Sequence, residues 1–372
     1  MQPLSGLLVL DFSTLLPGPM ATLILAEAGA EVVKIERPGP GDEMRGYVPR
    51  LGADSTNFVL LNRGKRSVTL DLKTQEDQAR LRPLLARADV LVEQFRPGVM
   101  ARLGLGYEAV AAINPRIVYC SISGYGQTGP KRDRAGHDLN YQGDAGMLAL
   151  SHGRQDDPSV PPALVADIGA GAYPAVINIL LALAERERTG RGRYLDVAMA
   201  DNLFPFLYWS LGQGAATGAW PGNADALVTG GSPRYRLYPT ADGRQAAVAT
   251  VEDRFWAKFC DAVGLDPALR DDARDPAATT RAVAALIAAR PAAHWRAVFE
   301  QADCCCSIVA TAQEGATDPH FIARGLFARR AGTAQASIPA LPVPIVEAFR
   351  APLTEEPAAA PAMGEGNAEY VP

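Results

Sequence analysis

Short apolar runs alternate with stretches of helical spacing over more than half of the chain. The apolar runs predict strands at Leu7–Asp11, Glu31–Glu36, Ser67–Leu72, Asp89–Glu93, Ile117–Ser123 and Tyr194–Val197. Apolar positions three and four residues apart predict helices at Met20–Ala28, Gln75–Ala88, Ile168–Arg188 and Asp201–Thr217. Strands that alternate with helices form a parallel sheet with right-handed crossovers. The predicted fold class is α/β, with a large Rossmann-like, doubly wound domain.

The pattern changes near Trp220–Asn223, where turn residues interrupt the alternation. Two short strands flanking Ala241–Gly243 are typical of a hairpin, and helical spacing follows as far as Gln301. These features predict a smaller α+β domain with linkers at residues 221–334. The large domain then covers residues 1–220 and is completed by residues 335–372, whose proline and alanine content favours an extended path.

Composition narrows the class of protein. The chain has 372 residues and a net charge of −5, which favours neither nucleic acid nor an anionic membrane surface as a partner. Its five cysteines form no disulfide framework and show no metal-ligand spacing, so we expect a cytoplasmic protein without a metal. The N-terminus lacks the pattern of a signal peptide, and the apolar run within Ile168–Ala184 is broken by glycine and proline, which favours a buried helix over a membrane span.

The stretch Gly124–Asp167 carries the candidate chemistry. It starts with glycines directly after a predicted strand, the place where an open α/β sheet puts its ligand crevice. His137, Asp138 and Asp167 lie within it, and histidine and aspartate are residue types that transfer protons. The same residues also suit a hydrogen-bonded turn and two helix N-caps, roles that are compatible with catalysis.

The predicted βαβ unit at residues 7–36 would suit a nicotinamide cofactor. The first turn, Ser13–Pro19, contains no G-x-G-x-x-G for the close approach of a pyrophosphate. Arg37 and Arg96 stand instead at strand ends, where they suit the phosphates of an external ligand as well as surface salt bridges. The sequence therefore does not favour a dinucleotide enzyme.

An ordered series of motifs resembles the class III coenzyme A-transferase superfamily. These motifs are Pro17-Gly18-Pro19, Ile35-Glu36-Arg37-Pro38, Asn62-Arg63-Gly64-Lys65-Arg66-Ser67, Asp71-Leu72-Lys73, Arg96-Pro97-Gly98 and Gly124-Tyr125-Gly126-Gln127-Thr128-Gly129-Pro130. Gly136–Tyr141 and Val251–Trp256 are similar to the α-methylacyl-CoA racemase branch, from which Asp253-Arg254 and the Cys304–Cys306 run depart.

This resemblance implies an acyl-CoA substrate, no cofactor beyond its CoA moiety, and an interlocked homodimer with its active site between one chain's large domain and the other's small domain. It also implies a set of CoA-binding residues: Arg37, Arg63, Lys65, Arg66, Leu70, Leu72, Lys73, Arg96 and Tyr141. Without the resemblance, the charge run at residues 63–66 is typical of a solvated face.

Racemisation of a thioester α-carbon needs two acid/base groups on opposite faces and stabilisation of the enolate oxygen. The resemblance assigns the first task to His137 and Asp167, with Glu252 as a carboxylate that orients the imidazole and Asp138 as a further catalytic residue. Burial is expected to raise the pKa of Asp167, and the helix N-termini at the two aspartates are expected to offer N–H donors to the enolate.

Two other functions remain open. A class III CoA-transferase would use Asp167 as a nucleophile and form an aspartyl-CoA thioester, so His137 and not Asp167 discriminates between the activities. A non-catalytic acyl-CoA-binding paralogue is the third possibility, and the presence of His137, Asp167 and Glu252 argues against it.

Overall fold

The computed structural model describes all 372 residues and groups them into two compact units. Unit 1 comprises Met1–Ala145, Ala163–Phe206 and Pro319–Pro372, and unit 2 comprises Gly146–Pro162 and Leu207–Asp318. These bounds differ from the predicted division into 1–220 with 335–372 and 221–334. One reason is that the Leu150 carbonyl accepts the Ala224 N–H at 2.9 Å. This hydrogen bond joins the segment 146–162 to the rest of unit 2.

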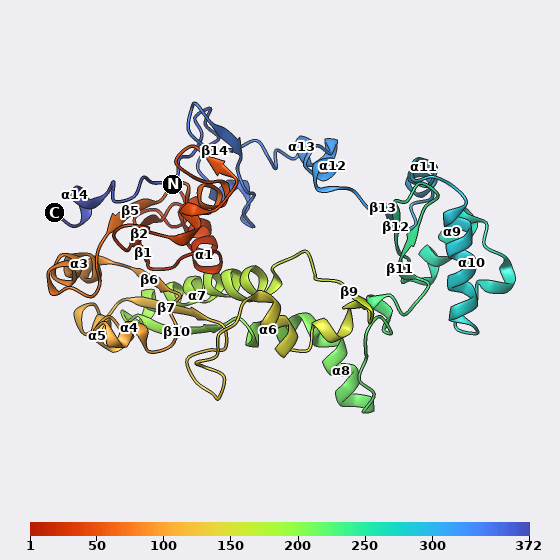
Figure 1. The fold of residues 1–372 in the computed structure, drawn as a ribbon, viewed down its shortest axis with the longest axis horizontal. Coiled ribbons are helices and arrows are strands. Elements are labelled where there is room, and N and C mark those ends of the chain that lie inside the picture. The colour runs from red at the N-terminus through yellow and green to blue at the C-terminus, as the bar shows by residue number, and fades with distance from the viewer. The chain divides into compact units, whose positions relative to one another are not determined.

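Six parallel strands form the sheet of unit 1 in the order β10-β7-β6-β1-β2-β5 (Figure 1). The strands are β1 Leu8–Asp11, β2 Glu31–Glu36, β5 Arg66–Thr69, β6 Val90–Glu93, β7 Val118–Ser123 and β10 Arg193–Ala198. The chain moves outward from β1 to β5, returns to the other side of β1 at β6, and continues to β10. This is the doubly wound order, with its switch point between β1 and β6, so the predicted α/β class with a parallel sheet is confirmed.

Helices cover both faces of this sheet. The helices of unit 1 are α1 Pro17–Glu27, α2 Thr56–Asn62, α3 Gln75–Arg87, α4 Val99–Arg102, α5 Tyr107–Ile113, α6 Asp138–Asp144, α7 Tyr173–Thr189, α13 Pro319–Ala323 and α14 Asn367–Tyr370. One face packs Leu8, Leu10 and Leu91 against Leu84 of α3 and Val110 of α5. On the other face α1 contacts β1, β2 and β6, while α7 contacts β7 and β10.

The helix that leads into α7 begins with a π-helical segment, Val165–Ala172. The combined stretch Val165–Thr189 is the one helix long and apolar enough to cross a membrane, although a core helix of a soluble protein passes the same test. Its inner side packs Ile179 and Ala182 within the unit, in agreement with the predicted buried helix, whereas Ile177, Leu180 and Leu181 are exposed.

Unit 2 contains a three-stranded antiparallel sheet and several helices, of which α10 and α11 contact the sheet. The strands are β11 Tyr235–Pro239, β12 Gln245–Ala249 and β13 Cys306–Ile308, and the helices are α8 Tyr208–Thr217, α9 Asp253–Val263, α10 Pro276–Ala288, α11 Ala292–Ala302 and α12 Ala312–Ala316. Trp256, Phe259, Trp295 and Phe299 form an aromatic core, which Cys304 joins. Of its two neighbours in the cysteine run, Cys305 is exposed and Cys306 is partly buried.

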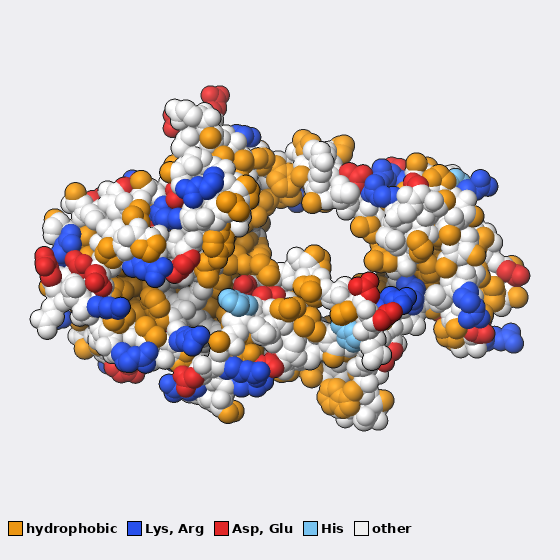
Figure 2. Space-filling view, in the orientation of Figure 1, with side chains coloured by type: hydrophobic (Ala, Val, Ile, Leu, Met, Phe, Trp, Pro, Cys, Tyr) orange, Lys and Arg blue, Asp and Glu red, His pale blue; other side chains and the backbone are white.

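Short two-stranded ribbons complete the fold. They are β3 Arg50–Leu51 with β4 Asp54–Ser55, β8 Gly153–Arg154 with β9 Asp157–Pro158, and β14 Arg330–Gly332 with β15 Ser337–Pro339. The C-terminal segment then runs along unit 1 and ends with Tyr370 and Val371 buried in the core beside the sheet. Basic and acidic side chains are interspersed over the visible face of both units, in keeping with the small net charge (Figure 2).

Candidate active site

A cavity of about 540 Å³ in unit 1 lies at the switch point of the sheet. Segments that follow three neighbouring strands line it: residues 14–17 after β1, residues 94–97 after β6 and residues 122–124 at the end of β7. The other lining residues are Arg132, Arg134–His137, Asn140, Tyr141, Asp167 and Met199. Ligands of doubly wound folds bind outside the carboxyl ends of the strands at this point of the topology. The cavity is therefore the candidate active site.

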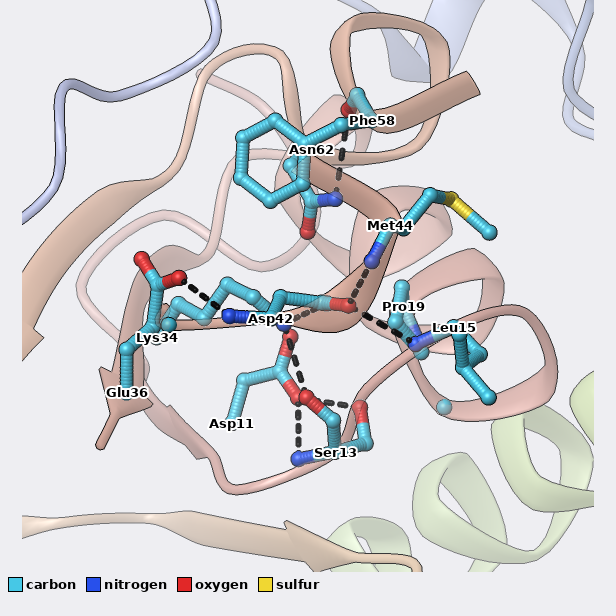
Figure 3. A network of polar contacts seen from close by, with 12 residues as sticks. Asp11, Ser13, Leu15, Pro19, Lys34, Glu36, Asp42, Met44, Phe58 and Asn62 are labelled. Atoms are coloured by element: carbon cyan, nitrogen blue, oxygen red, sulfur yellow. Dashed lines mark hydrogen bonds and ion pairs between the residues drawn. The ribbon is translucent and has the colours of Figure 1, made fainter. Parts of the chain in front are cut away.

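A buried network of charges supports the turn after β1 (Figure 3). Asp11 accepts hydrogen bonds from the Lys65 ammonium at 3.0 Å and from the Ser13 N–H at 3.0 Å. Lys34 forms an ion pair with Asp42 at 2.9 Å and donates to the Ser13 carbonyl at 2.7 Å. Although burial raises the pKa of Asp11, the ammonium groups of Lys65 and Lys34 hold it below its ordinary value.

The segment after β6 is held from two sides. Gln94 accepts the Gly18 N–H at 2.8 Å, which ties it to the start of α1. Glu93 accepts the Phe95 N–H at 2.8 Å and is almost fully buried. Burial raises the pKa of Glu93 to about 7, because no cation compensates its charge. These contacts fix the turn that carries Arg96 into the cavity.

The glycines before His137 allow a tyrosine ring to pack against the backbone. A Cβ atom at Gly124 would lie 2.5 Å from the Tyr141 ring, and one at Gly136 would lie 2.8 Å from it. Tyr141 is buried and donates its hydroxyl hydrogen to the Gly136 carbonyl. Tyr141 also lines the cavity, in keeping with its predicted contact to CoA. Its packing against the two glycines in addition positions the His137 loop.

His137 lies at the N-cap of α6 with an exposed side chain that lines the cavity. Its backbone N–H donates to Asn140 at 3.0 Å, which fixes the start of the helix. The backbone of His137 is therefore fixed by a hydrogen bond, and its imidazole lines the cavity.

The Asp138 side chain is buried and its carboxylate is hydrogen-bonded, whereas a catalytic residue is expected to have a free carboxylate. Its Oδ1 accepts the N–H groups of Ala166 at 2.7 Å and Asp167 at 3.0 Å, and its Oδ2 accepts from Gln142. These N–H groups at the start of the π-helix are thus occupied, which corrects the expectation that they serve the enolate. The contacts make Asp138 a positioning residue for Asp167.

Asp167 is half-buried in the first turn of the π-helix and does not precede the helix as predicted. Burial and, secondly, the charge of Asp138 raise the pKa of Asp167 to about 6, while His137 opposes the shift. The expected direction of this pKa shift is therefore present. His137 and Asp167 line the same cavity, and a carboxylate with a pKa near neutrality is suited to accept and return a proton.

Three of the predicted CoA-binding residues are buried, which corrects their assignment as surface contacts. Arg63 donates to Glu27 and to the Leu341 carbonyl, Lys65 belongs to the network around Asp11, and Leu70 lies in the core. Their side chains hold the fold together. The charges of Arg63 and Lys65 are therefore already paired within the fold.

The other predicted CoA-binding residues lie on the surface of unit 1 or close to it. Arg37 pairs with Glu43 at 2.7 Å, Arg66 lies 3.7 Å from Glu365, Lys73 is exposed and Leu72 packs partly against the core. Of the predicted CoA-binding residues, only Arg96 and Tyr141 line the cavity.

Glu252 belongs to unit 2, where it is the exposed N-cap of α9 and makes no side-chain capping bond. The neighbouring departure from the racemase segment has a structural explanation. Asp253 pairs with Arg234 at 2.6 Å, and Arg234 also donates to the Val251 carbonyl. Arg234 thereby contacts the residues on both sides of Glu252.

Sequence reasoning missed several cavity residues. Arg132 and Arg134 lie between Gly129 and His137, where their charge was a visible signal. Leu15 gave no signal, because its unusual backbone angle depends on contacts with distant residues.

Comparisons with known proteins agree with the motifs. The model of CoA-transferase family III matches residues 4–367. Acetyl-CoA:oxalate CoA-transferase of Acetobacter aceti is 36% identical, with 89% of this chain and 86% of that protein covered. Alpha-methylacyl-CoA racemase of Mus musculus is also 36% identical, with 87% and 82% covered. The crystal structure of a CAIB/BAIF family protein from Brucella suis superposes with a TM-score of 0.83 at 30% identity, with 99% of this chain and 98% of that chain covered.

Proposed function

The chain belongs to CoA-transferase family III, and from this premise we propose that it racemises the α-carbon of 2-methylacyl-CoA thioesters. The observation that supports racemisation most is the presence of His137 and Asp167 in one cavity, with the pKa of Asp167 raised to about 6. A racemase needs two such groups, whereas a transferase needs the carboxylate alone.

The proposed reaction has two proton transfers. One residue of the pair removes the α-proton, and the electrons of the C–H bond move into the thioester to form an enolate. The other residue then gives a proton to the opposite face of the α-carbon. In one direction the Asp167 carboxylate is the base and the His137 imidazolium is the acid, and in the other direction the roles are reversed. The only cofactor in this scheme is the CoA moiety of the substrate.

Asp138 and Arg96 are assigned supporting roles in this proposal. Asp138 holds the backbone of Asp167 and raises its pKa through its charge. Arg96 is exposed in the cavity and offers its guanidinium to a phosphate of CoA. The role of Glu252 in orienting the imidazole stays a prediction, which Glu252→Gln tests through the loss of racemisation at unchanged CoA-ester binding.

A class III CoA-transferase is the second candidate, because a transferase and a racemase are equally similar to this chain. In that reaction the Asp167 carboxylate would attack the thioester carbonyl and expel CoA thiolate as a mixed anhydride forms. The thiolate would then attack the Asp167 carbonyl and release the donor carboxylate, which leaves CoA on Asp167 as a thioester. His137 would have no required role.

Deuterium incorporation separates the two candidates. Incubation of a 2-methylacyl-CoA with the enzyme in D₂O should place deuterium at C2 and scramble the configuration. Treatment with hydroxylamine or borohydride during turnover should leave Asp167 unmodified. A trapped Asp167 adduct together with no deuterium at C2 favours the transferase.

The interlocked homodimer and a cytoplasmic location are also proposals. The exposed apolar residues Ile177, Leu180 and Leu181 follow one another at helical spacing on α7 and support burial of this face by a second copy. Their spacing places them on one stripe of the helix.

A further inference from the structure

Leu15 has a backbone conformation that its residue type rarely adopts. Its φ is 62°, and it is the one non-glycine residue of unit 1 with a positive φ. The left-handed region brings the Cβ atom close to the following carbonyl oxygen, so glycine, asparagine and aspartate are the residues that tolerate it. A branched side chain there is strained, and such strain persists where the surroundings impose it.

Buried charges impose this conformation (Figure 3). Asp42, which is buried, accepts the Leu15 N–H at 3.2 Å and the Met44 N–H at 3.0 Å. The Lys34 ammonium joins Asp42 to the Ser13 carbonyl, and the Ser13 N–H is bound to Asp11. The backbone is thus anchored on both sides of Thr14 by two buried carboxylates.

The strained residue lines the cavity that contains Asp167. Thr14, Leu15, Leu16 and Pro17 form the part of the lining that follows β1, and none of these four residues is charged. Glycine would adopt the same backbone without strain but would leave this wall without a side chain. An apolar side chain that is held at this position at an energetic cost is suited to pack against an apolar part of the ligand.

We propose that Leu15 is a specificity-determining residue that contacts the acyl chain of the substrate next to its α-carbon. The proposal rests on the acyl-CoA activity proposed above and adds the residue that selects the acyl group. The charge network around Asp42 acts through Leu15 and is a positioning device. Leu15 itself takes no part in proton transfer.

The test uses two unreactive ligands, S-ethyl-CoA and S-(2-methylbutyl)-CoA, whose thioethers carry no acidic α-proton. The ratio of their dissociation constants, measured by calorimetry on the full-length protein, reports acyl selection without turnover. The wild type should prefer the branched thioether. Leu15→Gly and Leu15→Ala should each reduce that preference about tenfold, since apolar contacts of this size discriminate by that order.

Thermal melting reports the backbone strain at position 15 independently of the selection of the acyl group. Glycine relieves the left-handed backbone and alanine does not, so Leu15→Gly should melt at or above the temperature of Leu15→Ala, the reverse of the usual order. An unchanged preference for the branched thioether in both variants overturns the proposal, as does a lack of preference in the wild type. A wild type that binds neither thioether contradicts the acyl-CoA function as well, and the two failures are thereby distinguished.

Discussion

Asp138 accepts the backbone N–H of Asp167 at 3.0 Å, so the residue after His137 holds the second residue of the proposed catalytic pair. The same oxygen accepts the Ala166 N–H at 2.7 Å. A contact across 29 residues of sequence therefore joins the two segments that supply the site.

Loss of either member of the pair should stop inversion. His137→Ala and Asp167→Ala are each expected to lower racemisation by about two to four orders of magnitude, as for a lost general acid or base. Chiral chromatography of the recovered acyl group measures this rate. Retention of near wild-type racemisation by His137→Ala contradicts the two-base mechanism.

The pH dependence should follow the raised pKa of Asp167. As the pH falls through about 6, protonation of Asp167 removes the base, so kcat/KM for the direction in which it abstracts the proton should fall. Asp138→Asn removes the second cause of the pKa shift and should move the inflection to lower pH. An inflection that does not move shows that burial alone sets the pKa.

Arg96→Ala should weaken binding more than it slows chemistry. A guanidinium on a phosphate contributes equally in the ground state and the transition state, so KM should rise about tenfold or more while kcat stays close to the wild type. Arg116→Ala is the matched control, because Arg116 is exposed, pairs with Glu187 and does not line the cavity. A large fall in kcat with unchanged KM for Arg96→Ala contradicts the phosphate contact.

Glu93 should make the folded protein less stable as the pH rises. Its pKa is about 7 in the folded protein and 4.5 ordinarily, so the folded state binds its proton more tightly than the unfolded state. The resulting stabilisation is complete below pH 4.5 and is lost as the pH rises to about 7. Glu93→Gln should remove this loss and increase the free energy of unfolding at pH 8 by up to about 3 kcal/mol. Urea denaturation at pH 5 and pH 8 measures the difference, and equal effects at both pH values refute the assignment.

A charge on the apolar stripe of α7 should impair self-association. Leu181 is exposed on α7, and Leu181→Lys would place an ammonium in the proposed interface. Sedimentation velocity should show a dimer for the wild type and a shift towards monomer for the variant, whereas Glu187→Lys on the same helix serves as a control for charge alone. A wild type that is monomeric and active at micromolar concentration rules out the obligate dimer.

Local patterns predicted the sheet well because each buried strand is an apolar run. Glu31–Glu36 was predicted with the observed bounds, and His137 and Asp167, which the motifs single out, line one cavity. The start of the π-helix was missed because Asp138 supplies its N-terminal acceptor from a distant part of the chain, a contact that no local spacing reveals.

The burial of Arg63 and Lys65 was missed for a related reason. A run such as Arg63-Gly64-Lys65-Arg66 is ordinarily solvated. The family resemblance assigned the run to CoA binding but still implied that it lies on the surface. Arg63 and Lys65 are buried because Glu27 and Asp11, far away in sequence, neutralise them. Burial of a charge depends on such a partner, and sequence spacing does not identify it.

The network beneath the β1–α1 turn also limits how the protein can diverge. It contains two carboxylates and two ammonium groups, from Asp11, Asp42, Lys34 and Lys65, and all four are buried. Replacement of one member alone leaves an uncompensated charge in the interior, at a cost of about 3–5 kcal/mol. Viable evolutionary paths therefore exchange these residues in pairs or not at all. New acyl preferences should arise by single substitutions at positions 15 and 16, while the four charged residues of the network are retained.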